Sequence, residues 1–312
     1  MRQRFAEVTT ELLSTHERLA LVLADLSAAL FQDAARACGE RVINLGIREQ
    51  LLIGVTGGLS LAGMRPIAHS FAPFLIERPF EQIKLDLNHQ HVGAILVSAG
   101  ASYDMAAGGR THQAPGDVAL ISTLPDWTVH VPGHPDEAER QLREATLTDD
   151  LVYIRMSSQT NQWPYGFDSR GGWGKSDIRS RLLRNGSAGI VIAVGPMADP
   201  VLEATKGLDI TVLYAPTVRP FDTATLRGLL TTGSRGANIV LVEPYLAGTS
   251  AAEVSQALTD IPHRLLCLGV GKDELRHYGT PRQHAIAHGL APAGMRYRIS
   301  SFLDPTLTLA SQ

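Results

Sequence analysis

The sequence predicts an α/β protein of two domains, each built on a mainly parallel sheet flanked by helices. Short apolar runs alternate with amphipathic stretches along the chain, which is the pattern of strands that alternate with helices. Its length of 312 residues suits about two domains of ordinary size. A polar, glycine-rich segment in the middle separates two such α/β units.

In the first unit, short apolar runs predict strands, and apolar residues at helical spacing predict helices. The predicted strands are residues 19–26, 41–45, 92–98, 128–131 and 151–156. The predicted helices are residues 6–18, 47–62, 76–89 and 135–147. Gly63 indicates a left-handed end to the long helix, and Pro135 suits the first position of the last one. Residues 100–116 predict a loop.

The second unit repeats the alternation after the polar segment 157–177. Its predicted strands are residues 189–194, 210–214, 238–242 and 264–268, and its predicted helices are residues 197–206, 222–231 and 249–259. We therefore expect domains at residues 1–160 and 181–312, joined by a linker at residues 161–180.

Composition excludes several classes of function. The formal net charge of −3 gives no electrostatic reason to bind nucleic acid or an anionic membrane. No apolar run reaches the 18 or so residues that a membrane span needs, and the first residues are polar where a signal peptide would be apolar. Cys38 and Cys267 lie far apart and form no metal or redox spacing. We expect a cytoplasmic protein.

Eight segments, taken in order, resemble the second half of transketolase. In the first unit they read RVINLGIREQLLIGVTGGLSLAGMRPI (41–67), HSFAPFLIERPFEQIK (69–84), GGRTHQAPGDVALISTLPDWTVHVPGHPDEA (108–138) and LVYIRM (151–156). In the second they read AGIVIAVGPM (188–197), YAPTVRPFD (214–222), VLVEPYLAG (240–248) and GVGKDELRHYGTPRQHAIAHGL (269–290). The resemblance implies a pyrimidine-binding domain for thiamine diphosphate, followed by the transketolase C-terminal domain, which we assign to assembly.

The segments that hold the diphosphate in transketolase are missing from this sequence. Full-length transketolase has a preceding domain with a GDG segment and a later asparagine that holds the metal. The chain therefore resembles the beta subunit of a split enzyme. The resemblance implies that a separate subunit holds the diphosphate and most of the Mg²⁺ shell, in an alpha2beta2 heterotetramer that is active only when assembled.

Glu49, in the GIREQ segment, is the principal candidate for catalysis. The resemblance implies a glutamic acid that hydrogen-bonds the aminopyrimidine and favours loss of the thiazolium proton. An apolar pocket would raise the pKa of such a carboxyl group and keep it protonated. The plain alternative is an acidic residue in the first turn of a helix, where the helix dipole favours it.

The cofactor ring also needs aromatic neighbours. Phe71 and Phe74 follow a strand, and the resemblance implies that at least one of them stacks on the pyrimidine, with Ile47 also beside the cofactor. Stacking contributes roughly 0.5–1.5 kcal/mol beyond the burial of area. A third aromatic that the resemblance leads us to expect is Glu77 here. The plain alternative for both phenylalanines is a place in the core.

His112 lies in the loop GGRTHQ, and the resemblance implies that it faces the substrate, supported by Gln113. A histidine suits this role because it changes charge near neutral pH and can donate to an oxyanion. The plain alternative is a loop histidine in solvent.

Three departures from the family pattern bear on the substrate. Tyr103 replaces a histidine that contacts sugar hydroxyls, Gly108 replaces an aspartate, and Ser158 stands where a phosphate-binding arginine is expected. Serine cannot replace the paired charged hydrogen bonds of arginine to phosphate. Arg110 could supply this contact from the loop, whereas Arg155 could equally be structural.

The sequence therefore favours transfer of a two-carbon ketol unit between carbonyl or sugar substrates. Two alternatives stay open. The chain could be the beta subunit of a 2-oxoacid dehydrogenase or of an acyloin-type synthase, because both need the same activation of the cofactor. It could also be a non-catalytic scaffold subunit.

Overall fold

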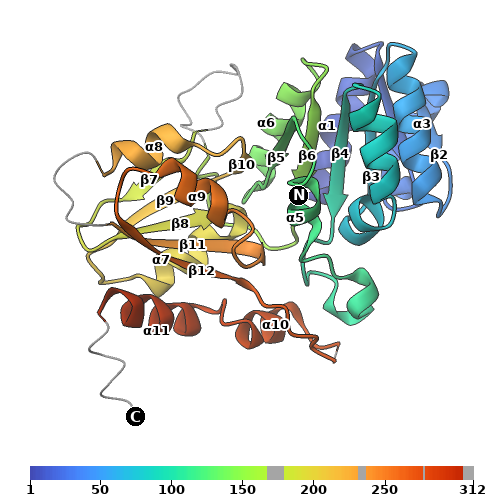
Figure 1. Ribbon diagram of the computed structural model, residues 1–312. Coiled ribbons are helices and arrows are strands. Elements are labelled where there is room, and N and C mark those ends of the chain that lie inside the picture. The colour runs from blue at the N-terminus through green and yellow to red at the C-terminus, as the bar shows by residue number, and fades with distance from the viewer. Residues whose placement is uncertain (167–178, 231–236, 277, 305–312) are drawn as a thin grey trace.

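Two domains, each built on its own sheet, make up the chain (Figure 1). The computed structural model describes residues 1–166, 179–230, 237–276 and 278–304. Both sheets are mainly parallel and flanked by helices, so the predicted fold class is confirmed. None of the helices within these ranges has the length and apolar character needed to cross a membrane.

The described residues of the first sheet form seven strands in the order β10-β5-β6-β4-β3-β1-β2. Their bounds are β1 Leu19–Leu23, β2 Val42–Asn44, β3 Arg65–Phe71, β4 Ala94–Ala99, β5 Trp127–His130, β6 Leu151–Arg155 and β10 Thr217–Arg219. Every pair is parallel except β10 with β5. The edge strand β10 comes from the second unit of the sequence. The first sheet therefore includes residues beyond the predicted first domain, residues 1–160.

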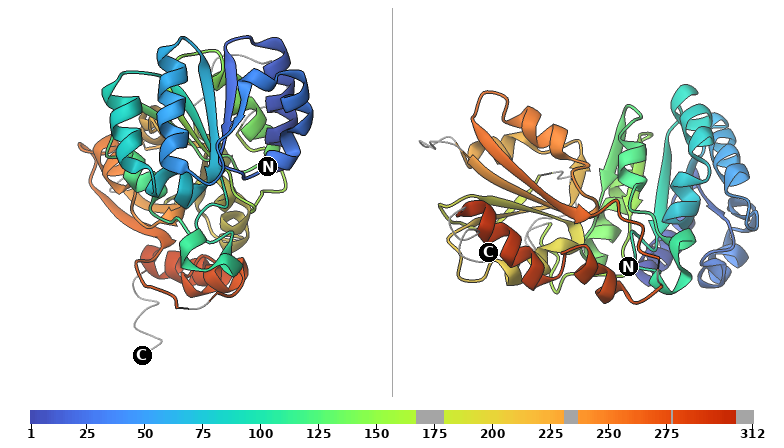
Figure 2. Two further views of the ribbon diagram at one scale, coloured as in Figure 1. Left: turned by 90° about the vertical axis from the view of Figure 1, so that its right-hand side faces the viewer. Right: turned by 60° about the horizontal axis from the view of Figure 1, so that its bottom comes forward.

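Helices cover both faces of the first sheet. Their bounds are α1 Arg2–Thr15, α2 Gln32–Ala37, α3 Glu49–Leu61, α4 Phe80–Gln82, α5 Asp117–Ile121 and α6 Pro135–Ala145. Along β1, Leu21 joins the core beneath α1, whereas Val22 joins the core beneath α3. The helices α1 and α3 thus lie on opposite faces, as the left view of Figure 2 shows. Strands buried on both faces read as continuous apolar runs, which explains why they were predictable.

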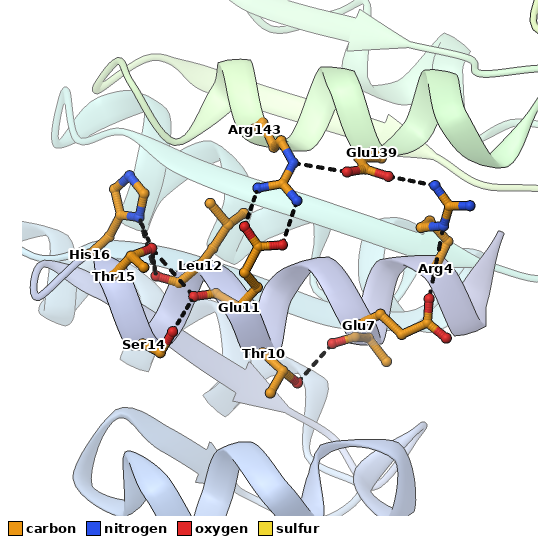
Figure 3. Close-up of polar contacts among 11 residues, drawn as sticks. Arg4, Glu7, Thr10, Glu11, Leu12, Ser14, Thr15, His16, Glu139 and Arg143 are labelled. Atoms are coloured by element: carbon orange, nitrogen blue, oxygen red, sulfur yellow. Dashed lines mark hydrogen bonds and ion pairs between the residues drawn. The ribbon is translucent and has the colours of Figure 1, made fainter. Parts of the chain in front are cut away.

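Charged side chains link α1 to α6 along their exposed edges (Figure 3). Arg143 donates from Nη1 and Nη2 to the two carboxylate oxygens of Glu11, at 2.9 and 2.6 Å, and from Nε to Glu139 at 3.0 Å. Arg4 donates to the other oxygen of Glu139 at 2.5 Å. This network fixes the register of the two helices on one face of the sheet.

The second sheet has five strands among the described residues, in the order β12-β11-β8-β9-β7. Their bounds are β7 Arg181–Arg184, β8 Ile190–Val194, β9 Thr211–Ala215, β11 Ala237–Leu246 and β12 His263–Val270. Only β7 runs antiparallel to its neighbour within this described sheet. Its helices are α7 Ala198–Ala204, α8 Thr223–Gly228, α9 Ala251–Ala257, α10 Pro281–Ala287 and α11 Pro292–Leu303.

One apolar cluster runs through both domains, from Leu52 and Tyr153 in the first to Ile190 and Tyr245 in the second. The contact between domains is therefore a buried core and not a loose hinge. Residues 167–178, which include most of the predicted linker, lie outside the described residues. The boundaries at residues 160 and 180 stay a prediction.

Candidate active site

The candidate site lies where the parallel strands of the first sheet end. Asn44, the last residue of β2, accepts hydrogen bonds on Oδ1 from the backbone N–H groups of Asp25 and Gly46, each at 3.1 Å. Gly46 has φ +68°, a left-handed conformation that glycine adopts without strain. This turn brings the chain from β2 directly into α3, whose first residue is Glu49.

Glu49 is buried, with only 2% of its side chain exposed. It lies in the first turn of α3, where the positive end of the helix dipole favours a carboxylate. Its Oε2 accepts a hydrogen bond from Arg78 Nη1 at 2.7 Å. Arg78 closes the π-helical turn η3 (Pro73–Glu77) and is 40% exposed. The carboxyl group therefore has one partner that reaches it from the surface.

Three rings lie beside this ion pair. The ring centroids of Phe71 and Phe74 are 6.2 Å apart, and His112 lies 5.9 Å from Phe71 and 5.1 Å from Phe74, all in edge-to-face arrangements. The guanidinium carbon of Arg78 lies 4.2 Å from the centroid of Phe74. Glu49, Phe71, Phe74 and His112 are thus brought together, although they come from distant parts of the sequence.

The loop that carries His112 is shaped by glycine. His112 ends the short turn η6 (Arg110–His112), and its Nδ1 lies 3.0 Å from Thr111 Oγ1. A Cβ atom on Gly108 would lie only 2.8 Å from the His112 ring. The aspartate expected at position 108 would therefore push His112 away from its present place.

A cavity of about 460 Å³ opens next to Phe71 at the carboxyl ends of β3, β4 and β6. Clefts at this edge of a parallel sheet are the usual ligand sites of α/β proteins. Its polar lining includes Asp104, Ser157 and Ser158. Asp104 accepts hydrogen bonds from Ser157 Oγ at 2.9 Å and from the Ser158 backbone N–H at 2.7 Å.

Burial raises the pKa of two carboxyl groups, of which Asp104 lines this cavity and Glu77 lies outside it, beside Arg110 and Gln113. Burial raises the pKa of Asp104, against the hydrogen bonds from Ser158 and Ser157, which lower it. Burial, and then the charge of Asp117, raise the pKa of Glu77, the residue at the position of the expected third aromatic. Asp104 and Glu77 therefore each take up a proton more readily than an exposed carboxyl group does.

The structure does not bring every predicted site residue into this group. Tyr103 is buried and stacks on His284 and His288 of the second domain, at centroid distances of 5.7 and 6.0 Å. Arg110 pairs with Glu274 through Nε, at 3.1 Å to each carboxylate oxygen. Both residues thus contact the second domain, and their predicted substrate roles stay predictions.

The two other predicted residues lie at the rim of the site. The side chain of Ile47 is 71% exposed just before α3. Gln113 is half-buried, and its carbonyl oxygen accepts from Arg110 Nη1 at 3.1 Å. Ile47 is free to contact another molecule, but its predicted contact with a cofactor stays untested by this geometry.

Arg155 has a structural role, which the sequence left open. It is fully buried and donates from Nε to Asp117 Oδ2 at 2.7 Å. Its Cζ lies 5.1 Å from the ring of Tyr245 in the second domain. Arg155 therefore belongs to the domain contact, and Met156, Ser157 and Ser158 are the residues that line the cavity after β6.

Sequence reasoning missed Arg78 and Asp104. Arg78 lies one helical turn after Phe74, so the two share a face, and this spacing was the available signal. Asp104 follows Tyr103 in a stretch that resembles a His-Asp pair of the family, but it was assigned no role of its own. Within the described ranges, no group of three or more histidine, cysteine, aspartate or glutamate side chains is arranged to hold a metal ion.

Comparison with known families and proteins gives consistent results. Residues 1–162 match the family described as the pyrimidine binding domain of transketolase. An uncharacterized 33.6 kDa protein of the fasciation locus in Rhodococcoides fascians is 50% identical over 96% of this chain and 93% of that protein. One of the subunits of the apulose-4-phosphate transketolase of Actinobacillus succinogenes is 30% identical over 60% of each chain.

Longer relatives and a solved structure extend the similarity to both domains. The 1-deoxy-D-xylulose-5-phosphate synthase of Synechococcus sp. strain CC9605 is 28% identical over 95% of this chain, which spans only 46% of that enzyme. A solved structure described as a split gene transketolase, an inactive beta4 tetramer, is 27% identical and superposes with a TM-score of 0.80 over 97% of both chains.

Proposed function

Since the chain belongs to the transketolase family, through its pyrimidine-binding domain, we propose that it is the catalytic-glutamate subunit of a two-chain, thiamine-diphosphate-dependent transketolase. In this proposal the enzyme moves a two-carbon ketol unit between carbonyl or sugar substrates in the cytoplasm. A separate subunit holds the diphosphate and Mg²⁺.

The burial of Glu49 against the aromatic cluster is the observation that carries the proposal. A carboxyl group with 2% of its side chain exposed needs a polar partner, and its partner Arg78 comes from the surface. Phe74 lies beneath that partner and presents a ring face. These residues fit a flat, nitrogen-containing ring that stacks on an aromatic and hydrogen-bonds a carboxyl group.

When bound, thiamine diphosphate supplies a nucleophilic carbon that attacks carbonyl groups. Glu49 would hold a proton at the carboxyl oxygen that Arg78 now contacts and would share it with the cofactor ring. Phe71 and Phe74 would orient the ring and exclude water. His112 has Nδ1 beside Thr111, so we assign Nε2 to the oxygen of the substrate.

An unpartnered apolar stripe on α3 supports the need for a second subunit. Leu51 and Leu61 on α3 are 45% and 63% exposed, and Ile47, two residues before the helix, is 71% exposed. Such a stripe is typical of an interface between subunits. The split transketolase in the comparison is described as an inactive beta4 tetramer, which supports the expectation that a beta chain without its partner does not turn over.

A second reaction is favoured by one observation. The relatives that match 95% of the chain include a 1-deoxy-D-xylulose-5-phosphate synthase. The acyloin-type synthase that the sequence leaves open would use a 2-oxoacid donor and release carbon dioxide. Release of carbon dioxide from pyruvate by the assembled enzyme would favour this alternative over ketol transfer.

Replacement of Glu49 tests the proposed role. The chain is co-purified with a candidate diphosphate-binding subunit, and ketol transfer is measured with Mg²⁺ and thiamine diphosphate. We expect Glu49→Gln to lower kcat by at least about 100-fold, because proton transfer by a positioned group contributes about 10²–10⁴-fold.

Glu17→Gln is the matched control. Glu17 is exposed and lies before β1, at the opposite end of the sheet, and its replacement removes the same charge. This variant should leave kcat unchanged. Unchanged turnover in Glu49→Gln would refute the catalytic role, and full activity of the partner without this chain would support a scaffold instead.

A further inference from the structure

We propose that Arg78 is an internal competitor for the cofactor ring: its guanidinium lies where the aminopyrimidine would bind and must turn away before the cofactor can enter. The inference rests on the proposed function of Glu49 and Phe74. It adds a residue that controls the affinity of the site for the cofactor ring.

Arg78 makes both kinds of contact that the proposal assigns to the cofactor. Its Nη1 donates to Glu49 Oε2 at 2.7 Å, and its Cζ lies 4.2 Å from the centroid of Phe74. A guanidinium is planar, carries only hydrogen-bond donors and stacks on aromatic faces. It therefore occupies the carboxyl oxygen and the ring face that the proposal assigns to the cofactor ring, and both groups cannot hold them at the same time.

The two partners of this ion pair differ in their freedom to move. Glu49 is fixed in α3 with 2% of its side chain exposed, whereas Arg78 is 40% exposed at the end of the turn η3. A long arginine side chain can rotate into solvent without moving the backbone. Arg78 is therefore the group that leaves, and Glu81, exposed one helical turn further on, offers it a charged neighbour outside the site.

This arrangement also explains why a competitor is present. A buried carboxylate without a partner destabilises a folded chain, so Glu49 needs a cation until its ligand arrives. Arg78 itself is 40% exposed, so water can solvate its guanidinium when the ligand displaces it. Because apparent affinity falls in proportion to the fraction of open sites, we expect Arg78 to weaken cofactor binding about ten-fold.

Calorimetric titration of the assembled two-chain enzyme with thiamine diphosphate, in the presence of Mg²⁺, tests the inference. Arg78→Met keeps the length of the side chain but removes its charge and donors. We expect the Kd for thiamine diphosphate to fall about ten-fold in Arg78→Met. Arg78→Gln, which retains a flat polar group, should show a smaller change in the same direction.

Arg18→Met is the matched control, since Arg18 is also an exposed arginine paired with a carboxylate, Asp149, but lies at the far end of the sheet. Its Kd should equal that of the unmodified enzyme. An unchanged or weaker Kd for thiamine diphosphate in both Arg78 variants would overturn the inference.

The failure of the proposed function would look different. If the unmodified complex bound no thiamine diphosphate at any concentration, the assignment of the site itself would be wrong. If it bound the cofactor with the same Kd as the Arg78 variants, only the competitor role would be lost.

Discussion

Three buried glutamates show how partners decide what a carboxyl group can do. Glu137 accepts hydrogen bonds from Tyr214 and from the backbone N–H groups of Gly133 and Gly166, so its oxygens are fully occupied. Glu243 is held by two backbone N–H groups of its own domain. Glu49 alone among the three pairs with a half-exposed side chain. Its partner can leave, so Glu49 is the one suited to meet a ligand.

The burial of Glu243 predicts that the stability of the chain depends on pH. It is fully buried in β11, and burial raises its pKa to about 7 from the usual 4.5, against hydrogen bonds from Ser250 and Gly248. Between these values the folded chain keeps a proton that the unfolded chain has lost. Its contribution to stability therefore falls as pH rises from about 4.5 to 7 and is constant above.

Denaturant unfolding of the purified chain at pH 5 and pH 8 measures this effect. We expect Glu243→Gln to gain stability relative to the unmodified chain by on the order of 2–3 kcal/mol between these values, since one pKa unit corresponds to about 1.4 kcal/mol. Glu17→Gln should follow the unmodified chain. An identical pH dependence in Glu243→Gln would contradict the assignment.

At the scale of elements, two neighbouring glycines of α3 lie in different surroundings. A Cβ atom on Gly57 would lie 2.6 Å from the backbone oxygen of Asp86, in the π-helical segment η4 (Ile83–His89). The backbones of α3 and η4 therefore approach closely at Gly57, within the chain. Gly58 is exposed, and no described atom lies within 4 Å of a Cβ added there.

These two neighbours make a paired prediction for the chain alone. Gly57→Ala should lower the free energy of unfolding by about 1–3 kcal/mol, because the new methyl group overlaps a backbone carbonyl. Gly58→Ala should raise it by up to about 1 kcal/mol through helix propensity. Thermal and denaturant unfolding measure both. Equal stabilities would show that α3 does not pack on η4 as described.

The exposed side of α3 also bears on association with the proposed partner subunit. Gly58 lies on the exposed side of α3 together with Leu51. If the partner subunit packs on this side, Gly58→Ala will weaken association while it stabilises the chain alone. Sedimentation of the mixed subunits would separate these two effects.

At the scale of the molecule, the two domains are joined by a buried polar contact at the base of the site. Arg155 pairs with Asp117, and Asp117 also accepts from Tyr153 at 2.7 Å. Ser102 connects the two sides of this contact, because its hydroxyl accepts from Arg155 at 2.6 Å and donates to the carbonyl oxygen of Pro244 in the second domain. The loop that leads to His112 therefore starts from a fixed point between the domains.

Breaking the Arg155–Asp117 pair should destabilise the whole chain. We expect Arg155→Met to cost about 3–5 kcal/mol of unfolding free energy, because it leaves the Asp117 charge buried without its cation. The double variant with Asp117→Asn should recover part of this loss. Arg227→Met, which breaks the exposed pair with Asp260, should have little effect. A similar small effect at Arg155 would refute a structural role for the pair.

The regular elements were predictable because their signals are local. The strands β1, β4, β6, β8 and β9 are mainly apolar runs, as is the Ile239–Val242 part of β11, and Gly63 does adopt the predicted left-handed conformation, with φ +86°. The short strand β10 was missed because its three residues have no strand pattern and pair only with β5 from the other domain. The turn η3 was likewise not distinguishable from an ordinary helix.

Sequence alone determined the alternation of buried strands and helices, the order of the two units, and the presence of Glu49, Phe71, Phe74 and His112 in segments that resemble one family. Tertiary structure decided which of these side chains share a site, that Tyr103 and Arg110 serve the domain contact, and that Arg78 reaches Glu49. The physical reason is that apolar periodicity is a local property, which can be recognised from neighbouring residues in the sequence. A contact between distant side chains instead depends on where the strand ends meet and on which groups remain buried there.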